Sequence, residues 1–208
     1  MKILFQGDSI TDCGRVKERE SDVGKGYPHL LKSELGFSAP GKYEFINKGI
    51  NGNRIVDIYA RIRNELINLK PDVLSILVGV NDVWHDFRAN PNGVAADKYY
   101  KIYDMLIEEI KAELPDIKII ILEPFVLKVE GTETETYWDR FDPEVREHAE
   151  MAKKIAEKHS LAFVPLQAGF DELCKSAPAE YWLLDGVHPT PMGHEFIKNE
   201  WLKAFKNI

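Results

Sequence analysis

The stretch Gly7-Asp8-Ser9, close to the start of the chain, has the residue types and the position of a turn that carries a nucleophile. It follows residues 2–6, an apolar run typical of a buried strand, and the glycine allows a tight turn. A serine hydroxyl is a poor nucleophile at neutral pH, because a general base must take its proton during attack. The rest of the chain would therefore have to supply a base, a residue that orients the base, and donors for an oxyanion.

His188 is the strongest candidate for the base among the six histidines. It lies in the turn 185–189, three residues after Asp185, and a carboxylate at that spacing can bind one imidazole nitrogen and leave the other for the serine. The same spacing also fits a plain turn with a capping role. His85 is a weaker candidate, and the remaining histidines lie within or beside predicted helices.

The candidate oxyanion donors are the backbone N–H groups of Ser9 and Gly52 and the side-chain amide of Asn81. Gly52 lets the backbone approach a ligand closely. Two plainer interpretations stay open at this point. Gly52 could only shape a turn after a strand, and Asn81 could only cap a helix. The G-x-G-x-x-G pattern of a dinucleotide site is absent.

Strands and helices alternate along the chain, which predicts a parallel sheet covered on both faces. We expect strands over 2–6, 43–47, 73–78, 117–122 and 161–164. We expect helices over 27–35, 55–69, 97–114 and 143–159, a small helix after the last strand, and a final helix capped by Thr190. The segment 126–142 has no periodicity and is predicted to be a long loop.

Five such strands indicate a flavodoxin-like α/β/α sandwich with the strand order 2-1-3-4-5. In that order a crevice opens at the carboxyl ends of the first and third strands. Ser9 follows the first of these strands and Asn81 follows the third, so the predicted fold and the predicted site agree.

Length and charge limit the classes of protein that the chain can represent. Its 208 residues predict one domain, 1–208, and 44% hydrophobic residues are enough for a substantial core. A net charge of -7 argues against nucleic acid or an anionic membrane as a partner. No apolar run is long enough for a membrane helix, and the N-terminus lacks a signal-peptide pattern, so a cytoplasmic protein is expected.

The two cysteines, Cys13 and Cys174, lack metal-ligand spacing and are expected to be reduced. Cys13 lies close to Ser9 and is an alternative nucleophile, but no partner for it stands beside it in the sequence.

Four blocks of this sequence resemble those of the GDSL or SGNH hydrolases, and they occur in the order typical of that superfamily. The blocks are Gly7-Asp8-Ser9, Asn47-Lys48-Gly49-Ile50-Asn51-Gly52, Gly79-Val80-Asn81-Asp82 and Asp185-Gly186-Val187-His188. The resemblance implies that Ser9 is the nucleophile, His188 the base and Asp185 its orienter. It also implies oxyanion donors at Ser9, Gly52 and Asn81, a flavodoxin-like fold and no metal or organic cofactor.

A narrower resemblance is to the bacterial acetylxylan esterases of this superfamily, some of which are intracellular. It is carried by residues 7–15, by 79–84 and by the pair Pro124-Phe125. It implies a small-molecule ester substrate, with acetylated xylo-oligosaccharides as the expected class. Asn51 is a departure, since many relatives have serine there, but the donor at the next residue is a backbone group.

The residues expected to bind substrate are Asp8, Trp84 and Trp182. Aromatic faces near an ester site can stack on sugar rings or pack an acyl chain, although tryptophans also pack loops against one another. Trp138 lies in the acidic 126–142 segment, which is a candidate lid or a contact between copies in a homo-oligomer.

Three other functions remain open from the sequence. A lysophospholipase or thioesterase of the same fold would differ in its acyl-chain preference. A metal-dependent phosphoesterase could use carboxylates and an imidazole, at Asp8, Asp12, Asp82, Asp185 and His188. A carbohydrate-binding relative without activity is the third.

Overall fold

Five parallel strands form the centre of the computed structural model, which describes residues 1–208, and their order is β2-β1-β3-β4-β5. The strands are β1 (Lys2–Gly7), β2 (Glu44–Asn47), β3 (Val73–Leu77), β4 (Lys118–Leu122) and β5 (Ala162–Val164). Every residue of β3 is buried, as expected for a parallel strand covered on both faces. The predicted fold class and strand order are confirmed.

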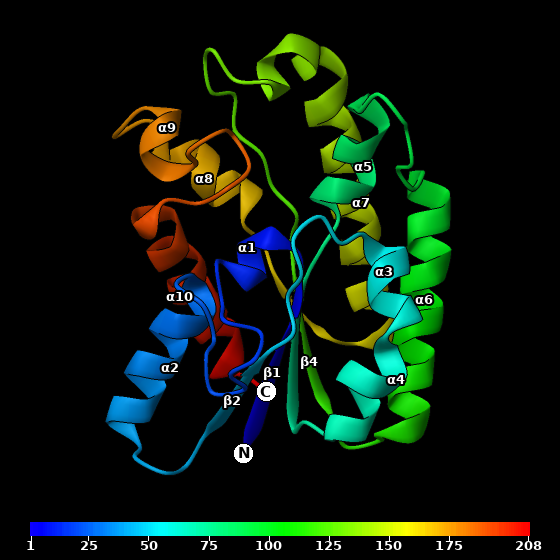
Figure 1. Ribbon diagram of the computed structural model, residues 1–208, viewed down its shortest axis with the longest axis vertical. Coiled ribbons are helices and arrows are strands. Elements are labelled where there is room, and N and C mark those ends of the chain that lie inside the picture. The colour runs from blue at the N-terminus through cyan, green and yellow to red at the C-terminus, as the bar shows by residue number, and fades with distance from the viewer.

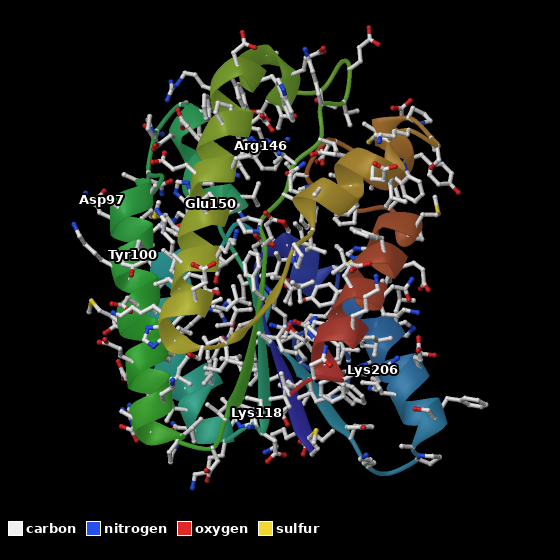
Figure 2. The ribbon with its side chains drawn as sticks, turned by 180° about the vertical axis from the view of Figure 1, so that it is seen from behind. Asp97, Tyr100, Lys118, Arg146, Glu150 and Lys206 are labelled. Atoms are coloured by element: carbon white, nitrogen blue, oxygen red, sulfur yellow. The ribbon has the colours of Figure 1, made fainter.

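Helices cover both faces of the sheet (Figure 1). One face carries α2 (Tyr27–Ser38) and α10 (Pro191–Phe205). The other carries α3 (Ile55–Ala60), α4 (Ile62–Glu65), α6 (Ala96–Glu113) and α7 (Trp138–His159). Figure 2 shows α6 and α7 side by side, with Tyr100 on the first and Glu150 on the second.

Short helices follow the carboxyl ends of the strands, in the upper half of Figure 1. They are α1 (Ser9–Asp12), α5 (Val80–Trp84), α8 (Gln167–Leu173) and α9 (Ala179–Trp182). Three further turns are 3₁₀ helices: η1 (Ile67–Leu69), η2 (His85–Phe87) and η3 (Thr134–Tyr137).

Each face of the sheet has its own apolar core. Trp201 of α10 is fully buried on one side, where its indole N–H donates to Ser75 Oγ of β3 at 3.0 Å. On the other side α6 buries Tyr99, Tyr103 and Leu106, the inner stripe that its helical spacing predicts. Both cores lie along the strands, and the polar side chains of Asp8, Asn81 and Asp82 are buried at the carboxyl edge of the sheet.

The single helix predicted over 55–69 is wrong, because the segment divides into α3, α4 and η1. The break lies at Arg61, whose backbone leaves helical geometry and whose guanidinium donates to Lys48 O at 2.8 Å. Ile55, Ile58 and Ile62 are still buried, so the apolar stripe was read correctly while the continuity of the helix was not.

Two other boundaries also differ from the prediction. Gly36 does not end its helix, since α2 continues to Ser38. The loop predicted over 126–142 is too long, because α7 already begins at Trp138. In the first turns of α7, Phe141 is buried against Trp84 and Phe87, and the helix continues through Pro143.

None of the helices combines the length and the apolar character that crossing a membrane would require.

Candidate active site

The turn after β1 places Ser9 at the first residue of α1. Gly7 makes this possible, because a Cβ atom there would come within 2.4 Å of Leu77 O on the neighbouring strand. The Asp8 carboxylate caps the turn, with Oδ1 accepting from Ile10 N–H at 2.9 Å. The serine side chain is thus presented at the carboxyl edge of the sheet by a turn with little freedom.

Ser9, His188 and Asp185 form one chain of hydrogen bonds, although 179 residues separate the first two. Ser9 Oγ lies 2.8 Å from His188 Nε2, and His188 Nδ1 lies 2.7 Å from Asp185 Oδ2. Asp185 Oδ1 accepts from the backbone N–H groups of Val187 and His188 at 3.0 and 2.8 Å. The carboxylate is therefore held by its own turn while it orients the imidazole.

The turn that carries Asp185 is braced by the segment before α7. Leu127 N–H donates to Gly186 O at 2.9 Å, and the buried Thr134 hydroxyl donates to Asp185 O at 3.2 Å. Gly186 has a φ of +87°, and a Cβ atom there would lie 2.4 Å from Leu127 O. Residues 127–134 therefore fix the position of Asp185.

The pKa shifts of this pair agree with its geometry. The hydrogen bond from Asp185 raises the pKa of His188, against the opposing effect of partial burial. Burial alone would raise the pKa of Asp185, but the hydrogen bonds and charge of His188 outweigh it and leave that pKa below its ordinary value. An ionised carboxylate only accepts hydrogen bonds, so the proton between the two lies on His188 Nδ1. In the neutral imidazole, Nε2 is then free to accept the Ser9 hydroxyl proton.

The backbone N–H of Gly52 is a candidate oxyanion donor at the carboxyl edge of the sheet. Gly52 has a φ of +76°, a backbone conformation that favours glycine, and its N–H donates to no acceptor within the chain. The preceding residue, Asn51, lines the same pocket as Ser9. An N–H group without an internal acceptor is what an oxyanion site requires.

The buried side chain of Asn81 lies beside this loop. Its Nδ2 donates two long hydrogen bonds, of 3.3 Å to Asn53 O and 3.4 Å to Asp8 Oδ2. Such weak bonds leave the amide able to donate to a developing negative charge. Asn81 therefore links the serine turn to the Gly52 loop.

Asp82 is a supporting residue whose role the sequence did not reveal. Its carboxylate is fully buried, and both oxygens accept from Ile55 N–H, at 3.0 and 3.2 Å. Burial raises the pKa of Asp82 well above its ordinary value, and the Ile55 N–H opposes this shift. Asp82 ties α5 to the residues just after Gly52. The sequence placed Asp82 in the block Gly79-Val80-Asn81-Asp82 and among the candidate metal ligands, but it gave no sign of the contact with Ile55.

The pocket at Ser9 has a volume of about 300 Å³. Its lining consists of Ser9, Ile10, Cys13, Gly14, Asn51, Leu184, His188, Pro189 and His194. One wall carries the amide of Asn51 and another the exposed side chain of Leu184.

The three residues expected to bind substrate lie in different places. Trp84 is half-buried with its ring centroid 5.9 Å from that of His188, beside the site. Asp8 is buried, and its carboxylate oxygens are bonded to Ile10 and Asn81 within the protein. Trp182 lines a separate apolar hollow with Met192 of α10. Trp84 and Asp8, the residue before Ser9, therefore lie beside the hydrogen-bonded chain, whereas Trp182 lines a different hollow.

His194 and Cys13 form a second pair of a histidine and a possible nucleophile, and both residues line the same pocket. Cys13 Sγ lies 3.4 Å from Nε2 of His194, and Nδ1 of His194 accepts from the backbone N–H of Tyr27 at 3.2 Å. Burial, followed by the charge of His188, lowers the pKa of His194 to about 4. Burial raises the pKa of the Cys13 thiol. Both cysteines are free, as expected.

The residues considered for a metal site do not assemble into one. No group of three or more histidine, cysteine, aspartate or glutamate side chains is arranged to hold a metal ion. Asp82 is bonded to Ile55 and Asp185 to His188, so the carboxylates proposed as ligands serve separate contacts.

The parallel sheet and the family-specific blocks at its carboxyl edge define a carboxylic ester hydrolase of the GDSL or SGNH type. The chain belongs to the GDSL-like Lipase/Acylhydrolase family, which it matches over residues 5–196. It is 35% identical over 211 residues to an acetylxylan esterase of Geobacillus stearothermophilus, covering 97% of this chain and 92% of that one.

Solved structures agree with this assignment. A candidate GDSL-like lipase from Parabacteroides merdae has a TM-score of 0.90 at 36% identity, covering 99% of this chain and 95% of that one. The acetylxylan esterase Axe2 from Geobacillus stearothermophilus has a TM-score of 0.84 at 32% identity, covering 98% and 93%. The enzyme LAE5, from a metagenome of Lake Arreo in Spain, has a TM-score of 0.87 at 28% identity, covering 99% and 94%.

Proposed function

We propose that this esterase removes small acyl groups, chiefly acetyl, from carbohydrate esters such as acetylated xylo-oligosaccharides, and that residues 1–208 act as one catalytic domain. The observation that carries the proposal is the chain of hydrogen bonds from Ser9 through His188 to Asp185, at 2.8 and 2.7 Å. It supplies a nucleophile, a base and an orienting carboxylate at a pocket open to solvent.

In the first step Ser9 Oγ attacks the carbonyl carbon of the ester while His188 Nε2 accepts its proton. The carbonyl becomes a tetrahedral oxyanion, which the N–H groups of Ser9 and Gly52 and the Asn81 amide stabilise. Asp185 stabilises the imidazolium through its bond to Nδ1. Collapse of the intermediate breaks the ester C–O bond, and His188 returns the proton to the leaving alcohol.

In the second step a water molecule attacks the acyl-enzyme. His188 removes the proton from this water, and the same donors stabilise the second oxyanion. Collapse releases the carboxylic acid and returns the proton to Ser9. No step draws on a metal or an organic cofactor.

Two features support a short acyl group on a sugar. One is Asn51, which lines the pocket at Ser9 and offers hydrogen bonds of the kind that sugar hydroxyls make. The relative at 35% identity is named an acetylxylan esterase. Together these features favour an acetyl carbohydrate over a lipid ester.

The test is a side-by-side assay of the purified protein on acetylated xylo-oligosaccharides, other acetyl sugars and lipid esters, with aryl esters from acetyl to octanoyl as a chain-length series. We expect kcat/KM to fall steeply from acetyl to octanoyl and to be highest on the acetylated sugars. A flat chain-length profile would contradict the proposal and favour a lysophospholipase or thioesterase.

A further inference from the structure

A second and larger hollow adjoins the pocket of Ser9. Its volume is about 740 Å³, and it is formed by the loop 14–25 and by the first turns of α2. Gly14 lines both hollows, so they share a wall. The proposed reaction makes no use of this larger hollow.

Cationic side chains dominate the lining of the larger hollow. Arg19, Lys25 and Lys32 line it together with a single carboxylate, that of Asp22. This local excess of positive charge occurs in a chain whose net charge is -7. It is therefore a feature of this place rather than of the protein surface in general.

Only some of the charged side chains that line the hollow form hydrogen bonds within the chain. Asp22 Oδ1 accepts from Gly24 N–H at 2.8 Å, and Lys32 Nζ donates to Ser21 O at 2.6 Å. Arg19 and Lys25 are exposed, and none of the salt bridges within the chain includes either of them. A guanidinium and an ammonium are thus free to bind an anion from solution.

The hollow is attached to the segment that carries the serine. Lys25 N–H donates to Cys13 O at 3.0 Å, and Cys13 directly follows α1, the helix that begins at Ser9. The part of a substrate that leaves the Ser9 pocket past Gly14 would therefore meet these cationic groups. If the acyl group occupies the Ser9 pocket, as the proposed function requires, that part is the alcohol.

We propose that the hollow is a subsite for a carboxylate carried by the alcohol part of the substrate, such as a uronic acid unit of an acetylated oligosaccharide. This inference rests on the proposed function and narrows its substrate class. Arg19 and Lys25 bind the carboxylate, Arg19 with the planar geometry that a guanidinium offers to two oxygens. The hydroxyl groups of Ser21 and Ser33, which also line the hollow, are available to the sugar ring.

The experiment compares two acetylated xylo-oligosaccharides of equal length, one neutral and one with a uronic acid substituent. The readout is the ratio of their kcat/KM values for the wild type and for the double variant Arg19→Gln/Lys25→Gln. Lys154→Gln is the matched control, since Lys154 is an exposed lysine of α7 on the far face of the sheet. An aryl acetate reports whether each protein is folded and active.

We expect the wild type to prefer the acidic substrate roughly fivefold to tenfold at low salt, as two exposed charge pairs would give. The preference should disappear in the double variant, persist in Lys154→Gln, and weaken as salt screens the charges. Equal rates on the two substrates, or a preference that the double variant keeps, would overturn the subsite and leave the proposed function standing. Hydrolysis of the aryl acetate but of neither sugar ester would overturn both.

Discussion

Two histidines line one pocket, and each lies beside a side chain that could act as a nucleophile. His188 bonds Ser9 Oγ through Nε2 and Asp185 through Nδ1. The partner of Nδ1 is an acceptor, so Nδ1 carries the proton and Nε2 presents a lone pair to the serine. The same bond raises the pKa of His188, which strengthens it as a base.

His194 has the opposite arrangement. Its Nδ1 accepts from the Tyr27 N–H, and a backbone N–H can only donate, so the proton of the neutral ring lies on Nε2. That proton points at Cys13 Sγ, which leaves no lone pair to take a proton from the thiol. Burial holds the pKa of His194 at about 4, so the ring stays neutral near pH 7.

The two pairs differ in a way that shows that a histidine close to a hydroxyl or a thiol does not on that account act as its base. Whether the histidine can accept that proton depends on the partner of its other ring nitrogen, because this partner fixes which nitrogen carries the proton of the neutral ring. We therefore propose that the Asp185 carboxylate activates Ser9 through His188, whereas the Tyr27 N–H leaves Cys13 without a base.

The largest expected effect comes from removing the two candidate nucleophiles in turn. Ser9→Ala should lower kcat on an aryl acetate by on the order of 10⁶-fold, as loss of a triad serine does elsewhere. Cys13→Ala is the matched control and should change kcat by less than about threefold. An active Ser9→Ala protein, or an inactive but folded Cys13→Ala protein, would reverse the assignment.

The next effect comes from giving His188 a partner that no longer fixes its tautomer. Asp185→Asn keeps the size of the side chain but can donate to Nδ1, and we expect a loss in kcat of about 10⁴-fold. Circular dichroism would check that the variant is folded. A loss below about tenfold would show that the carboxylate does not orient the base.

A smaller effect is expected for a residue that serves the oxyanion rather than the base. Asn81→Ala should lower kcat by about 10²–10³-fold with little change in KM, because an oxyanion donor acts in the transition state. Single-turnover kinetics on an acetyl ester would separate the two parameters. A loss below tenfold would mean that Asn81 only holds the loop that contains Gly52 and Asn53.

The smallest effect is a shift of the pH profile. His188 acts as a base only when it is neutral, so kcat/KM should rise with pH through its pKa, above the ordinary value of about 6.5. Burial raises the pKa of Asp8 to about 6, and above that pH its charge helps to raise the pKa of His188. Asp8→Asn should therefore move the rising limb to lower pH. An unchanged limb would show that Asp8 does not act on the base.

Much of the fold could be predicted from the sequence because most of its strands are largely apolar and its long helices have a regular apolar stripe. The strand order followed from the alternation of strands and helices, and β3 and α6 were read almost to the residue. The errors fell where tertiary contacts override local pattern. One predicted helix is interrupted at Arg61, which binds Lys48 O, and α7 begins earlier than predicted, where Phe141 packs against other aromatic side chains.

The site was predictable only in part, and for a physical reason. Ser9, Asp185 and His188 stand in short blocks with recognisable spacing, so a sequence can propose them. The contacts of Asp82 with Ile55 and of Thr134 with Asp185 join segments 27 and 51 residues apart and leave no local pattern. The tautomer of His194 depends likewise on Tyr27, which lies 167 residues away.

The most direct test of the account is to treat the protein with a fluorophosphonate probe and map the adduct by peptide mass spectrometry. The account predicts one adduct, on Ser9, that forms in Cys13→Ala and is lost or greatly slowed in His188→Ala. Labelling of Cys13, or labelling of Ser9 at the same rate without His188, would contradict it.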